Sequence, residues 1–189
     1  MNKLPLTKKQ IVNLFKKQKI VIVNSEKVNL ENSEDRFLYE NIKSKINLPP
    51  FNNSAVDGYA ILKADLKTKK TFFCNRRIAA GDNKNIKIKP GEAVRIFTGA
   101  KVPRGCDVVI IQENVRTSSD QIYISTQSNI IKYQNIRKKG LDFKKGECIF
   151  NIGSLIKSRH LGSISMTGQT WVTVTRKPVV SILSTGNEI

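Results

Sequence analysis

The sequence has few of the residues that metal-dependent and nucleophilic enzymes most often use. Its 189 residues include three cysteines and one histidine. Cys74, Cys106 and Cys148 are widely separated and form no paired metal-ligand spacing, and His160 has no cysteine or carboxylate near it in sequence. Unreactive thiols are therefore favoured over a zinc or redox site. A Ser-His-Asp or Cys-His mechanism is disfavoured, so any acid–base chemistry would depend mainly on carboxylates and lysines.

Long apolar runs are also absent. No stretch approaches the roughly 20 apolar residues that a membrane-spanning helix needs. Polar residues interrupt the apolar ones near the N-terminus, which excludes a signal-peptide core. We therefore expect a cytoplasmic protein without membrane contact. The chain is long enough for one or two domains with a buried core.

Negative charge is scarce. The chain has 33 lysines and arginines against 15 aspartates and glutamates, a formal net charge of +18. This excess is typical of three situations: compositional drift toward Lys, Asn and Ile, attraction of small multiply charged anions, or nucleic-acid binding. The lysines are spread along the whole chain and few alternate with aromatic residues. Nucleic acid is therefore the least favoured partner.

Hydrophobic spacing predicts three helices, which lie on either side of a β-rich middle. Helices are predicted over residues 7–19, 33–42 and 158–167. Short strands punctuated by Gly, Asn, Asp and Pro are predicted at residues 19–24, 71–74, 85–89, 93–97, 108–112, 121–125, 148–150 and 171–175. Strands at this spacing between residues 51 and 146 favour a small β-barrel or a compact sandwich.

The last apolar run, residues 179–183, has a different character. Its nearly continuous apolar sequence predicts a strand covered on both faces, as in a parallel α/β sheet. A single strand of this kind has neither partner strands nor covering helices, so we expect the chain to be an incomplete part of a longer protein.

Four polar, glycine-containing clusters follow predicted strands or linkers, at residues 53–59, 95–100, 137–142 and 184–188. In the first, Asp57 precedes Gly58, so the carboxylate could reach a ligand or metal, although an ordinary Asp-Gly turn has the same sequence. In the second, Thr98-Gly99 offers a hydroxyl and amides to an oxyanion, as many hairpin ends also do.

The other two clusters suit anions. Arg137-Lys138-Lys139 precedes a glycine and could clamp a phosphate, or could form a solvated surface. Ser184-Thr185-Gly186 follows the apolar run, where open α/β sheets usually bind ligands, and Glu188 could hold a cation.

The order of these motifs resembles that of the molybdopterin molybdenumtransferase family. The resemblance runs from residue 48 to the end and is carried by PFNNSAVDGYA at 50–60, GEAVRIFTGA at 91–100, RKKGLD at 137–142 and the segment 178–189. It implies an α+β multidomain fold. A mixed linker domain, residues 1–48 and 147–177, would hold an inserted β-barrel-like domain, residues 49–146, and residues 178–189 would begin a truncated α/β molybdopterin-binding domain.

The family inserts molybdate into adenylylated molybdopterin and releases AMP, with Mg²⁺ as the usual cation. The resemblance implies a homodimer whose active site lies between the pterin-binding domain and the partner's barrel-like domain, and contact with the molybdopterin adenylyltransferase. A chain without most of the pterin domain is predicted to be inactive alone. The alternative is a non-catalytic dimerisation or scaffolding module related to the family.

The resemblance also assigns roles to residues. Catalytic roles fall to Asp57, Asp142 and Glu188, with Asp57 and Glu188 as metal ligands. Substrate-binding roles fall to Ser54, Thr98, Gly99, Arg137, Lys138, Lys139, Ser184, Thr185 and Gly186. The sequence departs from the family pattern at Asn52 and Asn187, where Asp is common, and at Val56 and Leu141.

Overall fold

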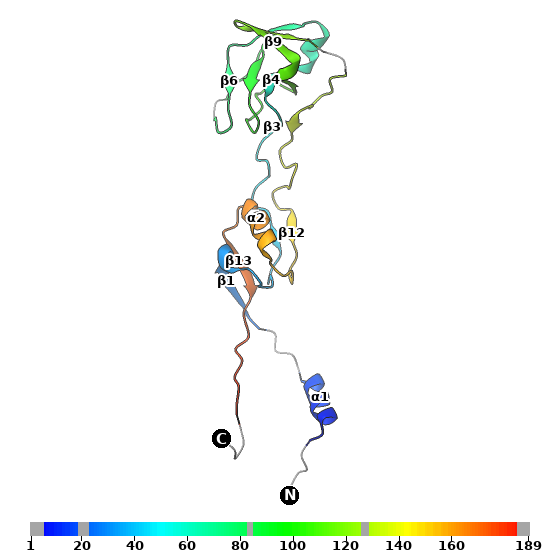
Figure 1. Cartoon of the computed structure of the whole chain (residues 1–189), viewed down its shortest axis with the longest axis vertical. Helices are drawn as coiled ribbons and strands as arrows, with labels where there is room; N and C mark the ends of the chain where they lie inside the picture. Colours follow the sequence, from blue (N-terminus) through cyan, green and yellow to red (C-terminus); the bar gives the residue numbers. More distant parts are fainter. Residues whose placement is uncertain (1–5, 19–22, 83–84, 126–128, 185–189) are drawn as a thin grey trace.

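The computed structural model describes residues 6–18, 23–82, 85–125 and 129–184, and these form an elongated molecule (Figure 1). Two packed units are joined by a neck in which two chain segments run side by side. We call residues 25–48 and 142–175 the central unit, and residues 51–136 the distal unit. Helix α1 and the C-terminal segment lie on the side of the central unit away from the distal unit. The predicted domain limits remain a prediction.

The central unit is a small α/β assembly. Its elements are β1 (Ser25–Asn29), the 3-10 helix η1 (Leu30–Asn32), β2 (Ile42–Lys43), β12 (Cys148–Phe150), α2 (Ser158–Met166) and β13 (Trp171–Thr175). Strands β1 and β13 are antiparallel, with Ser25 opposite Thr175, and β2 pairs with β12. The buried core consists of Leu30, Leu38, Ile42, Ile156, Ile164, Val172 and Val174.

The distal unit is built from two sheets. The four-stranded sheet has the order β6 (Arg77–Ile78), β7 (Val94–Ile96), β4 (Gly58–Ile61) and β8 (Val108–Ile111). The three-stranded sheet has the order β5 (Thr71–Phe73), β10 (Gln121–Ile124) and β9 (Val115–Ser118). The remaining elements are β3 (Asn53–Ser54), which pairs with β11 (Ile136–Arg137), and the 3-10 helices η2 (Lys63–Lys67) and η3 (Gln112–Asn114).

The predicted barrel does not close. The two larger sheets remain separate in the described ranges, and they pack through one core that includes Tyr59, Ile61, Phe72, Val108 and Ile122. A second core lies around Ala60, Val94, Ile96 and Val109. Alternate residues of β4 and β8 thus enter different cores, which explains why these strands are buried on both faces.

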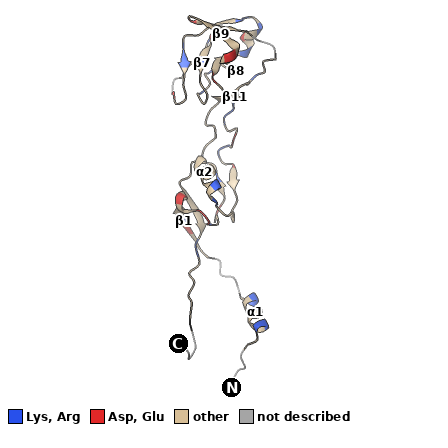
Figure 2. Ribbon diagram, viewed as in Figure 1, with Lys and Arg blue, Asp and Glu red and all other residues tan. Residues whose placement is uncertain are grey.

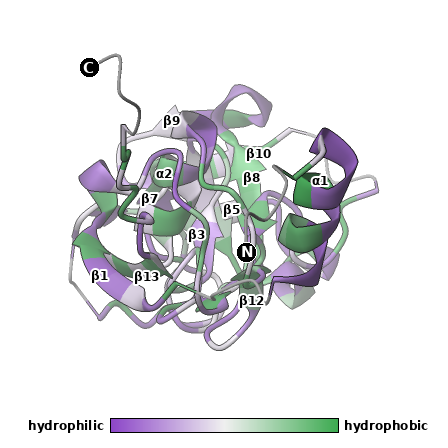
Figure 3. Ribbon diagram, turned by 90° about the horizontal axis from the view of Figure 1, so that it is seen from below, coloured by the Kyte–Doolittle hydropathy of each residue, from purple (hydrophilic) through white to green (hydrophobic). Residues whose placement is uncertain are grey.

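The predicted N-terminal helix is confirmed. Helix α1 spans Lys8–Lys17, and Thr7 caps it through its side-chain oxygen. None of its residues is buried, and lysines lie at both of its ends (Figure 2). Viewed from below, α1 carries hydrophobic and hydrophilic residues on different sides (Figure 3).

The helix predicted over residues 33–42 is wrong. Asp35 has a φ of 59°, which interrupts a right-handed helix. Residues 37–39 instead run beside β13, where Leu38 forms an isolated bridge with Val174 and the Tyr39 amide donates to the Thr173 carbonyl. The apolar spacing that suggests a helix here therefore reflects an irregular segment with Leu38 turned into the core.

Most predicted strands are confirmed to within one or two residues: those at 71–74, 93–97, 108–112, 121–125, 148–150 and 171–175, together with the helix at 158–167. The strand at 85–89 is wrong, because only Lys87 is paired, through a single bridge to Arg104. The strand at 19–24 lies mostly outside the described residues, and Val23 and Asn24 belong to no strand.

The apolar run at 179–183 forms no strand in the described structure. Val179 and Ile182 are 86% and 92% exposed. No described strand lies beside the run to pair with it, which explains the absence of regular structure. Among the described residues, no helix is long and apolar enough to cross a membrane.

Candidate functional site

Strand β3 brings together three of the four predicted clusters. On one side, the Ser54 amide donates to the Ala100 carbonyl and the Gly99 amide donates to the Ser54 carbonyl, both at 2.9 Å. On the other side, β3 pairs with β11, so that Asn53 lies opposite Arg137. Segments from residues 53–57, 98–101 and 136–137 therefore meet at the end of the distal unit that faces the neck (Figure 1).

Asp57 and Thr98 are in direct contact. The Thr98 amide and hydroxyl donate to Oδ1 of Asp57 at 2.8 and 2.7 Å. The Thr98 backbone and then the Thr98 hydroxyl lower the pKa of the Asp57 carboxyl, and the nearby positive charge of Arg95 adds to this effect. Asp57 is thus a fixed carboxylate at neutral pH.

The two predicted residues that flank this contact have backbone roles. Ser54 is 1% exposed, and its hydroxyl donates to the Val56 carbonyl at 2.6 Å. Gly99 has a φ of 81°, a conformation that favours glycine, and its amide is bonded to Ser54. Both residues shape the loop around Asp57 and Thr98, and their predicted substrate contacts remain predictions.

Arg137 and Asp142 form an ion pair with each other. One terminal nitrogen of Arg137 lies 2.8 Å from both carboxylate oxygens of Asp142. Both side chains are well exposed, and the Asp142 amide is fixed to the Leu48 carbonyl at 2.9 Å. A residue predicted to bind the substrate and a carboxylate predicted to be catalytic thus neutralise each other in this structure.

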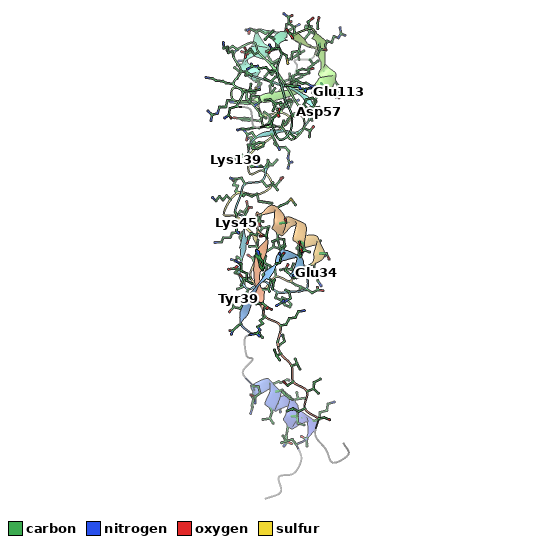
Figure 4. The ribbon with its side chains drawn as sticks, turned by 90° about the vertical axis from the view of Figure 1, so that its left-hand side faces the viewer. Glu34, Tyr39, Lys45, Asp57, Glu113 and Lys139 are labelled. Carbon is green, nitrogen blue, oxygen red and sulfur yellow. The ribbon has the colours of Figure 1, made fainter. Side chains whose placement is uncertain are left out.

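Lys138 and Lys139, which follow Arg137 in the sequence, have different surroundings. The Nζ of Lys138 lies 4.7 Å from the ring centre of Tyr133, a cation–π distance. The amide of Lys139 donates to Oδ1 of Asn52 at 2.9 Å, which ties this loop to the segment before β3. Lys139 lies in the neck, below Asp57, which lies at the edge of the distal unit (Figure 4).

The fourth cluster is only partly described. Ser184 is exposed, while Thr185, Gly186 and Glu188 lie outside the described residues. Within the described ranges, no group of three or more His, Cys, Asp or Glu side chains is arranged to hold a metal ion. Of the two predicted metal ligands, Asp57 lies within the described ranges and Glu188 does not, so the Mg²⁺ site stays a prediction.

Sequence analysis assigned no role to two residues next to Asp57. The Arg95 guanidinium lies over the rings of Tyr59 and Phe97, and the backbone amide of Gln112 donates to the Asp57 carbonyl at 3.2 Å. Arg95 is the one charged residue of β7, which was the signal available in the sequence. Gln112 follows β8 directly and carried no such signal.

A well-formed cavity lies away from this site. A cavity of about 480 Å³ is lined by Lys63, Leu66, Asp107 and Ile130, among others. It contains no predicted site residue. The contact between Asp57 and Thr98 lies outside this cavity and is exposed.

Comparison with known proteins decides the family. The family model described as "MoeA N-terminal region (domain I and II)" matches residues 7–168. This chain belongs to the MoeA family. The match covers the distal unit, the neck and the central unit as far as residue 168, and so includes the contact between Asp57 and Thr98.

Named relatives agree with this assignment. The molybdopterin molybdenumtransferase of Haemophilus influenzae is 37% identical over 166 residues, which cover 87% of this chain and 41% of the relative. That of Bacillus subtilis is 32% identical over 172 residues, covering 87% and 40%. This chain therefore spans about two fifths of the length of these MoeA relatives.

Solved structures agree as well. A crystal structure of the molybdopterin biosynthesis protein MoeA from Pyrococcus horikoshii has a TM-score of 0.79 and 29% sequence identity, and the match covers 90% of this chain and 44% of that one. A second MoeA structure from this organism has a TM-score of 0.75 and 31% identity. The mostly β architecture with two helices is thus that of MoeA proteins.

Proposed function

We propose that this chain supplies one side of the active site of a molybdopterin molybdenumtransferase in molybdenum cofactor biosynthesis. The reaction would insert molybdate into adenylylated molybdopterin and release AMP. The contact of Asp57 with Thr98 carries this proposal, because it joins two separate family motifs at an exposed position. The relatives' names support the pathway, and the AMP-releasing chemistry is our proposal.

The lowered pKa of Asp57 limits the catalytic roles that its carboxylate can have. A carboxylate with a lowered pKa is a poor proton acceptor at neutral pH, since general-base catalysis is most effective when the pKa lies near the working pH. We propose that Asp57 uses its fixed charge to orient a water molecule or a substrate hydroxyl. Glu188, for which the resemblance implies a catalytic and metal-binding role, would belong to the other side of the site.

The cationic loop would receive the anionic substrates. Arg137, Lys138 and Lys139 offer three positive charges at the neck. Both molybdate and the adenylylated pterin are anions, so these cations would reduce their mutual repulsion. Because the Arg137 guanidinium already donates to the Asp142 carboxylate, an incoming oxyanion would compete with Asp142 for it. Mg²⁺ dependence, a homodimer and contact with the adenylyltransferase remain parts of this proposal.

The proposal is tested by AMP release from adenylylated molybdopterin in the presence of molybdate. We expect none from the 189-residue chain alone. We expect activity when the chain is fused to the C-terminal remainder of the Haemophilus influenzae relative. Asp57→Asn should then reduce turnover strongly, whereas Asp120→Asn, in the exposed turn between β9 and β10, should not. Equal turnover in the two variants would remove Asp57 from the site.

A scaffolding role is the second candidate. Three aromatic residues of the central unit, Phe37, Tyr39 and Trp171, are 51%, 39% and 50% exposed. Exposed aromatic residues are typical of protein–protein contacts. Sedimentation of the wild-type chain and of Trp171→Ser would test this candidate. A monomer in both cases would contradict a scaffolding role of these aromatic residues.

A further inference from the structure

The guanidinium of Arg95 makes four contacts. Its guanidinium carbon lies 4.9 Å from the ring centre of Tyr59 and 5.0 Å from that of Phe97. One terminal nitrogen donates to the Gly58 carbonyl at 3.5 Å, and the other donates to the side-chain oxygen of Gln112. Two stacked rings and a forked set of donors fix a guanidinium in a way that a lysine cannot reproduce.

These contacts surround the backbone of Asp57. The Gln112 amide donates to the Asp57 carbonyl at 3.2 Å, and Arg95 holds both the Gln112 side chain and the next carbonyl, that of Gly58. Arg95 and Gln112, the first residue of η3, thus hold the two consecutive backbone carbonyls of Asp57 and Gly58. The turn has little freedom to move away, because a Cβ on Gly58 would lie 2.0 Å from the Ile110 carbonyl oxygen.

Arg95 also belongs to the segment that supplies Thr98. Strand β7 ends at Ile96, and only Phe97 separates it from Thr98, whose amide and hydroxyl hold the Asp57 carboxylate. The Phe97 ring that stacks on Arg95 fixes this short connection from the other side. One guanidinium therefore links the backbone of Asp57 to the segment that holds its side chain.

We propose that Arg95 is a positioning residue, which fixes the Asp57 carboxylate relative to Thr98 through the Phe97 ring and Gln112. The functional consequence rests on the proposed transferase activity, but the positioning itself does not. Arg95 acts through Asp57 and need not touch the substrate. A displacement of a catalytic group by about 1 Å can lower turnover by about a hundredfold, so such a residue matters as much as a contacting one.

Amide hydrogen exchange in this chain tests the positioning directly. We expect Arg95→Lys and Arg95→Gln to speed exchange of the Thr98 amide about tenfold or more, because its bond to Asp57 would open more often. The Gly99 amide of the same turn is bonded to Ser54 and should keep its protection. Arg116→Lys, at an exposed position of β9, is the matched control and should change neither amide.

The pattern of exchange separates positioning from general stability. Faster exchange at both Thr98 and Gly99 would mean that Arg95 merely stabilises the fold, and no change at Thr98 would mean that it does not hold the site. Either result overturns the proposal.

A double-mutant cycle for turnover gives the second test, with the fused chain described above. Arg95→Gln should lower kcat about tenfold or more with little change in KM, but should add at most about a twofold loss when Asp57→Asn is already present. Equal losses in both backgrounds would overturn the proposal. A fused wild-type chain without AMP release would instead contradict the proposed function and leave the exchange result to decide the role of Arg95.

Discussion

Thr98 places two donors on a single oxygen of Asp57: its amide nitrogen and its hydroxyl lie 2.8 and 2.7 Å from Oδ1. Both bonds favour the charged form of the carboxyl and lower its pKa. A carboxyl with a lower pKa in the folded state stabilises the protein above its unfolded-state pKa. That contribution is lost as the pH falls through the folded-state pKa.

Thr98→Val removes the hydroxyl donor and keeps the amide. We therefore expect the pKa of Asp57 to rise part of the way toward that of an ordinary aspartate, as followed by the carboxyl carbon shift in an NMR titration. Thr117→Val, at an exposed position of β9, should leave the Asp57 titration unchanged. An unaltered Asp57 titration in Thr98→Val would show that the hydroxyl bond is absent in solution.

Gly58→Ala should destabilise the distal unit. The added Cβ would lie 2.0 Å from the Ile110 carbonyl oxygen, so β4 and β8 would have to separate. Overpacking of this kind costs about 1–3 kcal/mol, and a backbone clash belongs at the upper end. Urea unfolding measures the loss.

Gly162→Ala is the matched comparison for Gly58→Ala. Gly162 lies inside α2, and nothing lies within 4 Å of the position that its Cβ would take. Alanine is the better helix former, so this change should stabilise the chain by about 0.5–1 kcal/mol. Equal effects of the two substitutions would contradict the tight approach of β4 to β8.

Asp142→Asn should separate stability from function. The side chains of Arg137 and Asp142 are 44% and 38% exposed, and an exposed ion pair contributes about 0.2–1 kcal/mol. We expect a small loss in the free energy of unfolding, which high salt should reduce further. We expect a much larger loss of AMP release in the fused chain. A stability loss above about 2 kcal/mol would instead assign Asp142 a mainly structural role.

The three cysteines should react in the order of their exposure. Burial raises the pKa of the Cys106 thiol to about 12, and burial also raises that of Cys74, whereas Cys148 is exposed. Thiolates react and thiols do not, so N-ethylmaleimide at neutral pH should modify Cys148 first. Cys106 should react only after unfolding in urea, as measured by peptide mass spectrometry. Early labelling of Cys106 would contradict its burial.

The sequence predicted the elements that have a clear period. Gln121–Ile124 alternates exposed and buried residues, and Lys8–Lys17 has helical spacing with Thr7 as its cap. The segment at 33–42 has similar apolar spacing but no helix. Its path is decided by distant partners, since residues 37–39 lie beside β13, far away in the sequence. Local pattern cannot report such a pairing.

The sequence suggests candidate site residues but not the contacts between them. The motifs around Asp57, Thr98 and Asp142 can be read from the sequence. The sequence gives no indication that Arg137 neutralises Asp142. Nor does it indicate that the Ser54 hydroxyl donates to a carbonyl of its own loop. These facts depend on how β3 packs between two segments that are distant in sequence. Arg95 was given no role for the same reason, because its contacts with Tyr59, Gly58 and Gln112 come from segments distant in sequence.

The pairing of Ser25 with Thr175 has a mechanical consequence. The chain enters and leaves the central unit at one point, where the Arg176 amide also bonds to the Asn24 carbonyl. Tension applied between Asn24 and Arg176 would peel the β1–β13 ladder apart from that end, one pair at a time. The distal unit is attached through the neck and would not carry this tension. Asp57 and Thr98 would therefore remain in contact while the ladder opened.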